Sequence, residues 1–259
     1  MRPKKRLGQH FLAPAWARTV AESAQLEEDN YVFEIGPGRG VLTKELLLRG
    51  ARTIAIEKDR ALVATLKTSF EKEIKDGRLT LIEGDALEID VEKLGLKNGK
   101  YTIVANIPYY ITGALLEKFL SQPPRPKTLV FLMQKEVAER IAKAKKESLL
   151  SLSVKAYGTP HYLNTVPRGA FNPAPEVDSA ILRIEGISDK KFDTREHEKR
   201  FFELIRAGFA HKRKLLSGNL KNLLGRGGEE ALAGVGLPKK VRAEDVPLEQ
   251  WLLLARQDP

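Results

Sequence analysis

The chain of 259 residues is 42% hydrophobic, contains no cysteine and carries 44 Lys and Arg against 34 Asp and Glu, a net charge of +10. This is ample apolar material for a core in one large domain or one domain with an appendage, and it excludes disulfides, thiolate metal sites and thiol nucleophiles. Because there is no run of about 18 apolar residues, no signal-peptide run after the basic N-terminus and no metal-ligand spacing among the four histidines, we expect a cytoplasmic protein without a membrane span or bound metal.

Short β-type runs alternate with amphipathic helical segments through the first two thirds of the chain. The predicted strands are 31–35, 53–57, 79–83, 102–106 and 128–133, and the helical segments between them are 41–49, 59–75 and 112–121. Each strand is almost continuously apolar, which is typical of a parallel sheet covered by helices on both faces. Two later runs, 161–167 and 179–184, have no crossover helix between them, so we expect them to pair antiparallel at an edge.

A polar segment without periodicity, 186–195, separates this region from one that is helical throughout. The predicted helices there are 196–209, 212–224, 228–234 and 248–256. We therefore predict two domains, an α/β domain over 1–187 and a small all-helical domain over 188–259.

The basic excess is concentrated in two places. Residues 1–18 hold five Lys or Arg and no acid, and residues 200–226 hold seven against one acid, Glu203. Clusters of this kind favour a polyanionic partner such as nucleic acid. The alternative is a surface that only confers solubility.

A glycine-rich turn, EIGPGRGVLT (34–43), follows the first predicted strand. Ligands of parallel α/β sheets bind at the carboxyl ends of the strands, and glycines there let the backbone approach them closely. The spacing G-x-G-x-G is not the G-x-G-x-x-G of dinucleotide folds, which argues against a nicotinamide dehydrogenase. A plain tight turn into a helix is the alternative.

Acidic residues stand at the ends of three successive predicted strands, at Glu34, Glu57 and Asp85. Glu57 follows Gly36 at about the sequence separation at which an acid hydrogen-bonds a ribose diol in nucleotide-binding folds. The alternative is a solvated acid at the start of a helix. The carboxylate of Asp85 is suited to accept a hydrogen bond from an adenine amine. Acids repel phosphate, so these positions indicate a nucleoside without phosphate, and S-adenosylmethionine fits.

The fourth predicted strand ends in NIPYY (106–110). The side-chain oxygen of Asn106 and the carbonyl of Pro108 can accept hydrogen bonds from the amino group of an adenine, and proline fixes the direction of its carbonyl. Tyr109 offers a ring for base stacking, which contributes ~1–3 kcal/mol per base. Catalysis would then rest on orientation and electrostatics. A proline-broken strand end is the alternative, and Tyr110 has no assigned role.

Further motifs run along nearly the whole chain. They are KKRLGQHFL (4–12), EIGPGRGVLT (34–43), IEKD (56–59), GDAL (84–87), NIPYY (106–110), MQKEVAER (133–140), VPRGAFNPAPEVDSAI (166–181), AGFAHKRKLLSGNL (207–220) and RAEDVPLEQW (242–251). Together and in this order they resemble the ribosomal-RNA adenine dimethyltransferase family, in its small-subunit branch. N-x-P-Y alone is weakly specific, whereas its combination with GQHFL and the F-x-P-x-P run is highly specific.

The resemblance implies a class I, Rossmann-like methyltransferase fold with a mostly parallel seven-stranded sheet, and S-adenosylmethionine as donor. It implies dimethylation of two adjacent adenines near the 3′ end of small-subunit ribosomal RNA, with a role in small-subunit biogenesis. The cofactor-binding residues implied by motif match are His10, Leu12, Gly36, Glu57, Asp85 and Asn106. The catalytic residues implied are Asn106, Pro108, Tyr109 and Phe171, with Phe171 stacking on the base opposite Tyr109. By residue type alone, Phe171 is better explained as a buried aromatic.

An adenine that enters a pocket must be flipped out or lie in a loop, so the RNA around it needs phosphate contacts. The candidates are Lys212, Arg213 and Lys214 in the helical domain, and Lys4, Lys5 and Arg6 near the N-terminus. The expected partner is small-subunit ribosomal RNA in an immature subunit, and the expected oligomeric state is a monomer.

Three positions depart from the family pattern, and two other functions compete with this one. Ile107 replaces the commoner Leu, Tyr110 a frequent Asn, and Glu176 an expected Lys, which bears on RNA affinity more than on the reaction.

One competing function is a large-subunit resistance methyltransferase, which the RAEDVPLEQW motif and the PAPEVDSA run disfavour. The other is a non-catalytic ribosome-assembly or transcription factor that keeps the fold for RNA binding. The intact Gly36, Glu57, Asp85 and Asn106 disfavour it.

Overall fold

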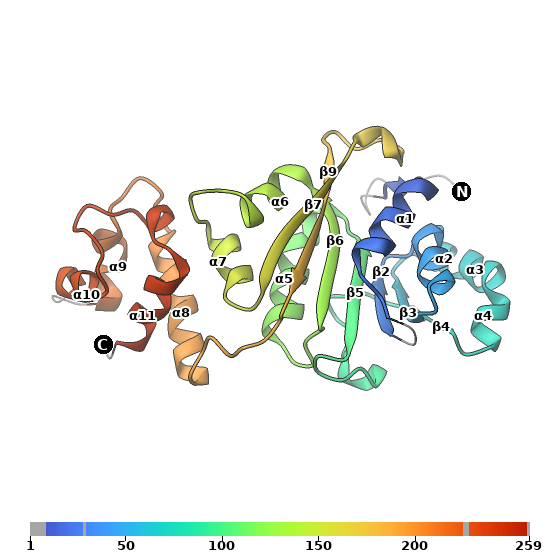
Figure 1. The fold of residues 1–259 in the computed structure, drawn as a ribbon, viewed down its shortest axis with the longest axis horizontal. Helices are drawn as coiled ribbons and strands as arrows, with labels where there is room; N and C mark the ends of the chain where they lie inside the picture. The colour runs from blue at the N-terminus through green and yellow to red at the C-terminus, as the bar shows by residue number, and fades with distance from the viewer. Residues whose placement is uncertain (1–8, 28–29, 225–227, 258–259) are drawn as a thin grey trace. The chain divides into compact units, whose positions relative to one another are not determined.

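The structure is a computed structural model that describes residues 9–27, 30–224 and 228–257. It divides into two compact units (Figure 1). The first comprises Met1–Ala138 and Thr159–Ile187, and the second Glu139–Gly158 and Ser188–Pro259. The predicted boundary at 187/188 coincides with one junction, but the second unit also contains residues 139–158. These join it because Tyr157, 2% exposed, packs against Phe192 and Phe202.

The first unit is built on a seven-stranded sheet in the order β4-β3-β2-β5-β6-β9-β7. The strands are β2 Tyr31–Ile35, β3 Arg52–Glu57, β4 Leu79–Glu83, β5 Tyr101–Asn106, β6 Thr128–Gln134, β7 Thr159–Val166 and β9 Ser179–Glu185. All pairs from β4 to β6 are parallel, whereas β9 pairs antiparallel with both β6 and β7. This confirms the predicted mostly parallel seven-stranded sheet with an antiparallel edge hairpin.

The strands at the centre of this sheet form the core of the unit. β2, β3, β5 and β6 are buried along almost their whole length, whereas the edge strands β4 and β7 are partly exposed. Side chains such as Phe33, Ile103 and Phe131 are fully buried, and each contributes roughly 1.5–3 kcal/mol of transfer free energy. A rigid sheet of this kind fixes the positions of the loops at its carboxyl edge.

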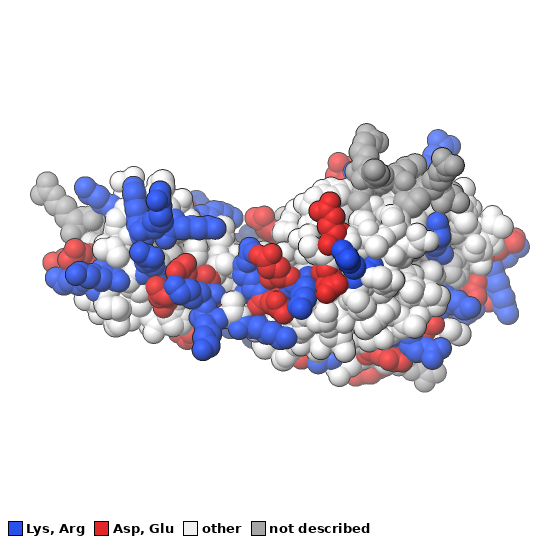
Figure 2. All heavy atoms as spheres, turned by 90° about the horizontal axis from the view of Figure 1, so that it is seen from above, with Lys and Arg blue, Asp and Glu red and all other residues white. Residues whose placement is uncertain are grey.

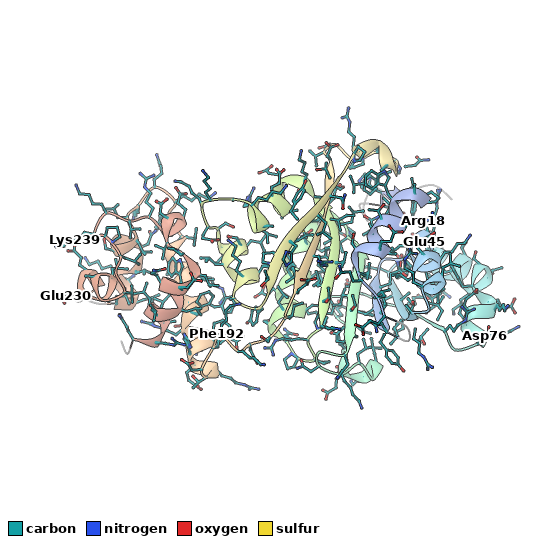
Figure 3. All side chains as sticks on the ribbon, in the orientation of Figure 1. Arg18, Glu45, Asp76, Phe192, Glu230 and Lys239 are labelled. Carbon is teal, nitrogen blue, oxygen red and sulfur yellow. The ribbon has the colours of Figure 1, made fainter. Side chains whose placement is uncertain are left out.

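The helices of the first unit include the three predicted segments 41–49, 59–75 and 112–121, the second of which is divided. They are α1 Pro14–Ser23, α2 Val41–Leu48, α3 Arg60–Ser69, α4 Glu71–Lys75, α5 Thr112–Ser121 and α6 Lys135–Ala142, the last of which runs into the second unit. The predicted helix 59–75 is broken at Phe70, whose backbone leaves the helical region at φ −118° and ψ 28°. Helix α1 was not predicted. Its Arg18 pairs with Glu45 of α2, with 3.9 Å between Nε and Oε2 (Figure 3).

A short antiparallel ladder joins two segments that are far apart in the sequence. β1 Phe11–Leu12 pairs with β8 Phe171–Asn172, so that Leu12 stands opposite Phe171. The amide of Ala13 extends the ladder by donating to the carbonyl of Ala170 at 2.8 Å. The ladder, which was not predicted, brings the GQHFL motif to the F-x-P-x-P run.

The second unit is helical. Its helices are α7 Leu149–Lys155, α8 Arg195–Gly208, α9 Leu216–Leu224, α10 Gly228–Gly234 and α11 Leu248–Arg256. An aromatic cluster around Phe192, labelled in Figure 3, includes Phe201 and Phe202, and Trp251 is fully buried. The predicted helix 212–224 begins only at Leu216, because three consecutive cations in a first turn would oppose the positive end of the helix dipole. Across the described ranges, no helix is long and apolar enough to cross a membrane.

Candidate active site

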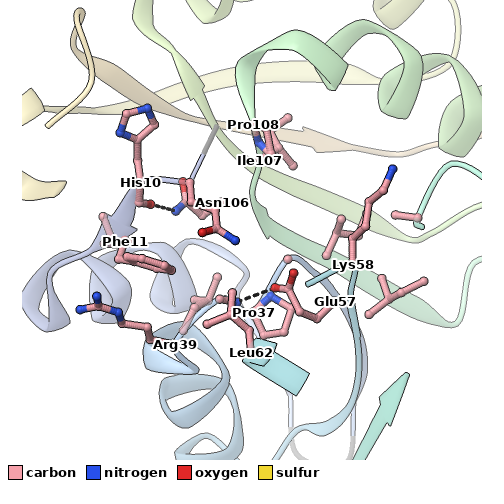
Figure 4. A pocket seen from close by; sticks show the side chains of 18 of the residues that line it. His10, Phe11, Pro37, Arg39, Glu57, Lys58, Leu62, Asn106, Ile107 and Pro108 are labelled. Carbon is pink, nitrogen blue, oxygen red and sulfur yellow. Dashed lines mark hydrogen bonds between the residues drawn. The ribbon is translucent and has the colours of Figure 1, made fainter. Parts of the chain in front are cut away.

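A cavity of about 310 Å³ opens at the carboxyl ends of the parallel strands (Figure 4). The turns after β2, β3, β4 and β5 line it, together with the N-terminal segment from Gln9 and with Phe171. The structure brings nine predicted site residues together here: His10, Leu12, Gly36, Glu57, Asp85, Asn106, Pro108, Tyr109 and Phe171.

The glycine turn forms the wall of the cavity nearest to α2. Gly36, Gly38 and Gly40 all have positive φ values, of 69°, 58° and 77°, which other residues adopt only with strain. A Cβ at Gly40 would collide with the Phe70 ring and lie 2.8 Å from Leu66 Cδ2. The turn therefore needs glycine for its conformation and, at Gly40, for packing space.

Glu57 at the end of β3 holds the glycine turn in place. Its Oε2 accepts a hydrogen bond from the amide of Gly38 at 3.0 Å, and its Oε1 accepts one from the amide of Asp59 at 2.8 Å. Burial raises the pKa of the Glu57 carboxyl, and the two backbone hydrogen bonds act against that rise. Each carboxylate oxygen can accept a further hydrogen bond, so the group retains capacity for a pair of hydroxyls.

Asp85, in the turn after β4, is paired with a cation. Lys58 Nζ lies 2.6 Å from Asp85 Oδ2, and the amide of Leu87 donates to Oδ1 at 2.9 Å. The hydrogen bond from Lys58 is the main reason why the pKa of Asp85 is lowered. Asp85 therefore remains an anion, and thus an acceptor, at the rim of the cavity.

Glu34 does not lie at a strand tip and does not line the cavity, so the predicted series of three acids is wrong at this position. It is inside β2, fully buried, and neither carboxyl oxygen has a hydrogen-bond partner among the described residues. Burial raises the pKa of Glu34 to about 8, opposed by the nearby Thr43 and supported by the charge of Glu57. The side chain is therefore largely protonated at neutral pH and belongs to the core.

The contact that Asn106 makes defines the orientation of its side-chain amide. Its Nδ2 donates to the backbone carbonyl of His10 at 3.0 Å, as the dashed line in Figure 4 shows. A carbonyl can only accept, so the nitrogen must face His10 and Oδ1 is the acceptor turned away from it. The amide thus presents an oxygen of the kind that the sequence predicted.

The 3₁₀ turn η3, Tyr109–Ile111, carries the aromatic part of the NIPYY motif. The hydroxyl of Tyr109 is 2.8 Å from Ser179 Oγ, and burial raises its pKa, so the ring is anchored and neutral. The carbonyl of Pro108 accepts from the amide of Ile111 at 3.2 Å and keeps one lone pair for another donor. Tyr110, to which the sequence assigned no role, also lines the cavity and is 67% exposed.

Phe171 belongs to the core and to the cavity at once. It is 7% exposed and packs in a hydrophobic cluster that includes Leu12 and Ala170, yet it lines the same cavity as Tyr109. The description as a buried aromatic therefore applies, and the stacking role stays a prediction.

Three residues to which the sequence reasoning gave no role complete the cavity wall, Gln9, Phe11 and Arg39. The guanidinium of Arg39 lies 4.2 Å above the centre of the Phe11 ring, and Phe11 also contacts the glycine turn near Gly38. Gln9 Nε2 donates to Asp59 Oδ2 at 3.0 Å. The signal that could have found Phe11 was its place between His10 and Leu12 in the GQHFL motif.

The predicted RNA contacts divide between two regions. Lys212, Arg213 and Lys214 are exposed in the turn between α8 and α9, and Figure 2 shows Lys and Arg side chains gathered on the helical unit. Lys4, Lys5 and Arg6 lie outside the described residues. In the part of the chain that the structure covers, no group of three or more His, Asp or Glu side chains is arranged to hold a metal ion.

Comparison with known families decides the class of the protein. The family described as "Ribosomal RNA adenine dimethylase" matches residues 1–257. The chain belongs to this family. It is therefore an S-adenosylmethionine-dependent ribosomal RNA adenine dimethyltransferase.

Individual relatives agree with this membership. The dimethyltransferase is 39% identical to the "Ribosomal RNA small subunit methyltransferase A" of Dehalococcoides mccartyi, over 97% of this chain and 87% of the relative. It matches the crystal structure of a dimethyladenosine transferase from Plasmodium falciparum with a TM-score of 0.76 at 26% identity, over 95% of this chain and 96% of that one. It matches the 23S rRNA methyltransferase ErmE with a TM-score of 0.75 at 27% identity, over 95% and 98%.

Proposed function

We propose that this enzyme dimethylates the exocyclic amino groups of two adjacent adenines near the 3′ end of small-subunit ribosomal RNA. The observation that carries the proposal is that one cavity holds both the acids suited to a nucleoside donor and the Asn106–Tyr109 turn suited to an adenine. The 39% identity to a small-subunit methyltransferase over most of both chains favours this substrate over large-subunit RNA.

The residues present fit S-adenosylmethionine. Gly36 leaves room beside its backbone, Glu57 can accept hydrogen bonds from a ribose diol, and Asp85 can accept one from an adenine amine. The backbones of His10 and Leu12, together with Gly36 and Asn106, complete the donor site. When bound, the cofactor supplies an electrophilic methyl group.

The chain prepares the target amino group by hydrogen bonding and stacking. Oδ1 of Asn106 and the Pro108 carbonyl hold the amino hydrogens, which turns the nitrogen lone pair away from conjugation with the ring. Tyr109, fixed by Ser179, offers the face on which the base stacks, and Phe171 closes the opposite wall. Alignment of this kind can supply about 7–11 kcal/mol. The amino nitrogen becomes a cationic, acidic group when it takes the methyl group, and it then releases a proton to water, so no strong general base is needed.

The substrate in this proposal is an immature small subunit, met in the cytoplasm by a monomeric enzyme. The exposed turn at Lys212, Arg213 and Lys214 contacts RNA phosphates from the helical unit, and Lys4, Lys5 and Arg6 add to this from the N-terminal segment.

The test is transfer of tritiated methyl groups to small and large subunits that lack these modifications, followed by mapping of the labelled nucleotides. We expect label at two adjacent adenines of the small-subunit RNA and a limit of four methyl groups per subunit. Label confined to large-subunit RNA would show instead that the enzyme is of the resistance type.

A further inference from the structure

One residue, His10, contacts all three parts of the chain that would enclose the target base. Its backbone carbonyl accepts from Asn106 Nδ2 at 3.0 Å, its ring nitrogen Nδ1 is 2.8 Å from the carbonyl of Pro173, and its ring stacks with Tyr109. Pro173 follows Phe171 and Asn172 of β8, so His10 connects the strand end, the stacking turn and the loop behind Phe171.

The hydrogen bond to Pro173 defines which ring nitrogen of His10 acts as donor. A backbone carbonyl can only accept, so Nδ1 must carry a hydrogen. This side-chain bond adds to the β1–β8 ladder, in which Phe11 stands opposite Asn172. Ladder and imidazole together fix the loop that follows Phe171.

The imidazole also restrains the Tyr109 ring. The two rings run nearly parallel, with 20° between their planes and 6.2 Å between their centres. The hydroxyl of Tyr109 is held at its far end by Ser179 at 2.8 Å. Tyr109 is therefore held at its edge and along its face, which fixes the plane on which a base can stack.

The backbone and the side chain of His10 face different parts of the cavity. In Figure 4 its carbonyl is turned toward Asn106, whereas its ring points away from Glu57, which lies at the ribose end of the donor site. We infer that the imidazole of His10 is a positioning residue for the target adenine and that only the backbone of His10 serves the donor site. This inference rests on the proposed function, since it assigns His10 within the same site.

Three variants separate the contacts of the side chain while they keep the carbonyl that holds Asn106. His10→Ala removes the ring and the donor, His10→Asn places an amide nitrogen where Nδ1 was, and His10→Phe keeps a ring without a donor. His161→Ala, on the outer strand β7 and away from the cavity, is the control. For each variant we would measure the cofactor Kd by calorimetry and the single-turnover rate of methyl transfer to unmodified small subunits at saturating cofactor.

We expect His10→Ala to lower the single-turnover rate about 10–100-fold, because small misplacements of a target have effects of this size. Its cofactor Kd should stay within about 3-fold of wild type, since no donor-site contact of the side chain is lost. His10→Asn should recover most of the rate, His10→Phe should recover part of it, and His161→Ala should match wild type.

Two results would overturn the assignment. One is a large rise in the cofactor Kd of His10→Ala with an unchanged rate at saturation, which would make the imidazole a cofactor ligand. The other is a rate that falls equally in all three variants. The hydrogen-bond donor of His10→Asn would then restore nothing, and the role of the side chain would be merely structural. Failure of the proposed function would be seen in the wild-type enzyme, which would then not label small subunits. Failure of the His10 assignment would be seen only in the variants, so the two outcomes can be told apart.

Discussion

Glu57 and Glu83 are equivalent in the sheet and different in their surroundings. They stand opposite each other at the ends of β3 and β4, but Glu57 is 7% exposed and accepts two backbone hydrogen bonds, whereas Glu83 is exposed and does not line the cavity. The two acids thus share a position in the sheet, and we propose that only Glu57, buried at the glycine turn, binds the cofactor.

Glu57→Gln should therefore weaken cofactor binding by about 10–100-fold, because hydrogen bonds to a charged group contribute about 1.5–3 kcal/mol. Calorimetric titration with S-adenosylmethionine measures this directly. Glu83→Gln is the matched control and should bind like wild type. Equal affinities for both variants would remove Glu57 from the donor site.

Gly40 allows a second residue-scale comparison, with Gly77. Both have φ near 70–77°, but a Cβ at Gly77 meets nothing within 4 Å, whereas one at Gly40 meets Phe70 and Leu66. Gly77→Ala should lower the free energy of unfolding by about 1–2 kcal/mol through backbone strain alone. Gly40→Ala should lower it by a further ~1–3 kcal/mol through overpacking. Urea unfolding would measure both, and equal values would show that packing at Gly40 is not tight.

At the scale of the elements, strand β2 carries a carboxyl group in the core at Glu34. Its pKa rises from 4.5 in the unfolded chain to about 8 in the folded one, so between these values only the folded state holds the proton. Unfolding then releases a proton, and the stabilising effect of the protonated group, complete below pH 4.5, is lost as the pH rises through 8.

Glu34→Gln keeps the shape of the protonated group and removes its titration. From pH 5 to pH 8, the free energy of unfolding of wild type should fall relative to that of the variant by roughly 3–5 kcal/mol. Urea unfolding of both proteins at several pH values gives this difference. Parallel pH profiles would contradict a protonated, buried Glu34.

Most elements could be predicted because their signals are local. Short β-type runs identified the seven main strands, and the edge hairpin followed from the missing crossover helix. The β1–β8 ladder could not be found in this way, because two-residue strands have no periodicity and their partners lie about 160 positions apart. Likewise, residue type placed Glu34 at a strand tip, whereas its burial depends on neighbours that only the fold supplies.

The residues of the site could be predicted where their motifs lie at the ends of strands. Glu57, Asp85 and Asn106 meet in one cavity because parallel strands have their carboxyl ends at one edge. The cation–π contact of Arg39 with Phe11 and the ion pair of Lys58 with Asp85 were not predictable, since they depend on side-chain directions in separate loops.

At the scale of the whole molecule, the charge of +10 is expected to act through RNA phosphates. Replacing Lys212, Arg213 and Lys214 by Ala should reduce the slope of log affinity against log salt by up to about 2–3, because each phosphate contact contributes about 0.7–0.9. Filter binding of small-subunit RNA at several salt concentrations measures the slope.

A matched control removes the same charge elsewhere. Lys93, Lys97 and Lys100 are exposed in the segment before β5, at the opposite end of that strand from Asn106. Their triple Ala variant should keep the wild-type slope. If the two triple variants lose the same slope, net charge and not the turn at 212–214 governs RNA binding.

The central claim is that donor and target meet at Asn106. It is tested most directly by the single-turnover rate of methyl transfer to unmodified small subunits by Asn106→Ala at saturating cofactor, with the cofactor Kd measured in parallel. We predict a rate at least about 1,000-fold below wild type, with a cofactor Kd raised by no more than about 10-fold, since the lost oxygen acts mainly on the amino group. A variant that saturates with cofactor and transfers methyl groups at the wild-type rate would contradict the account.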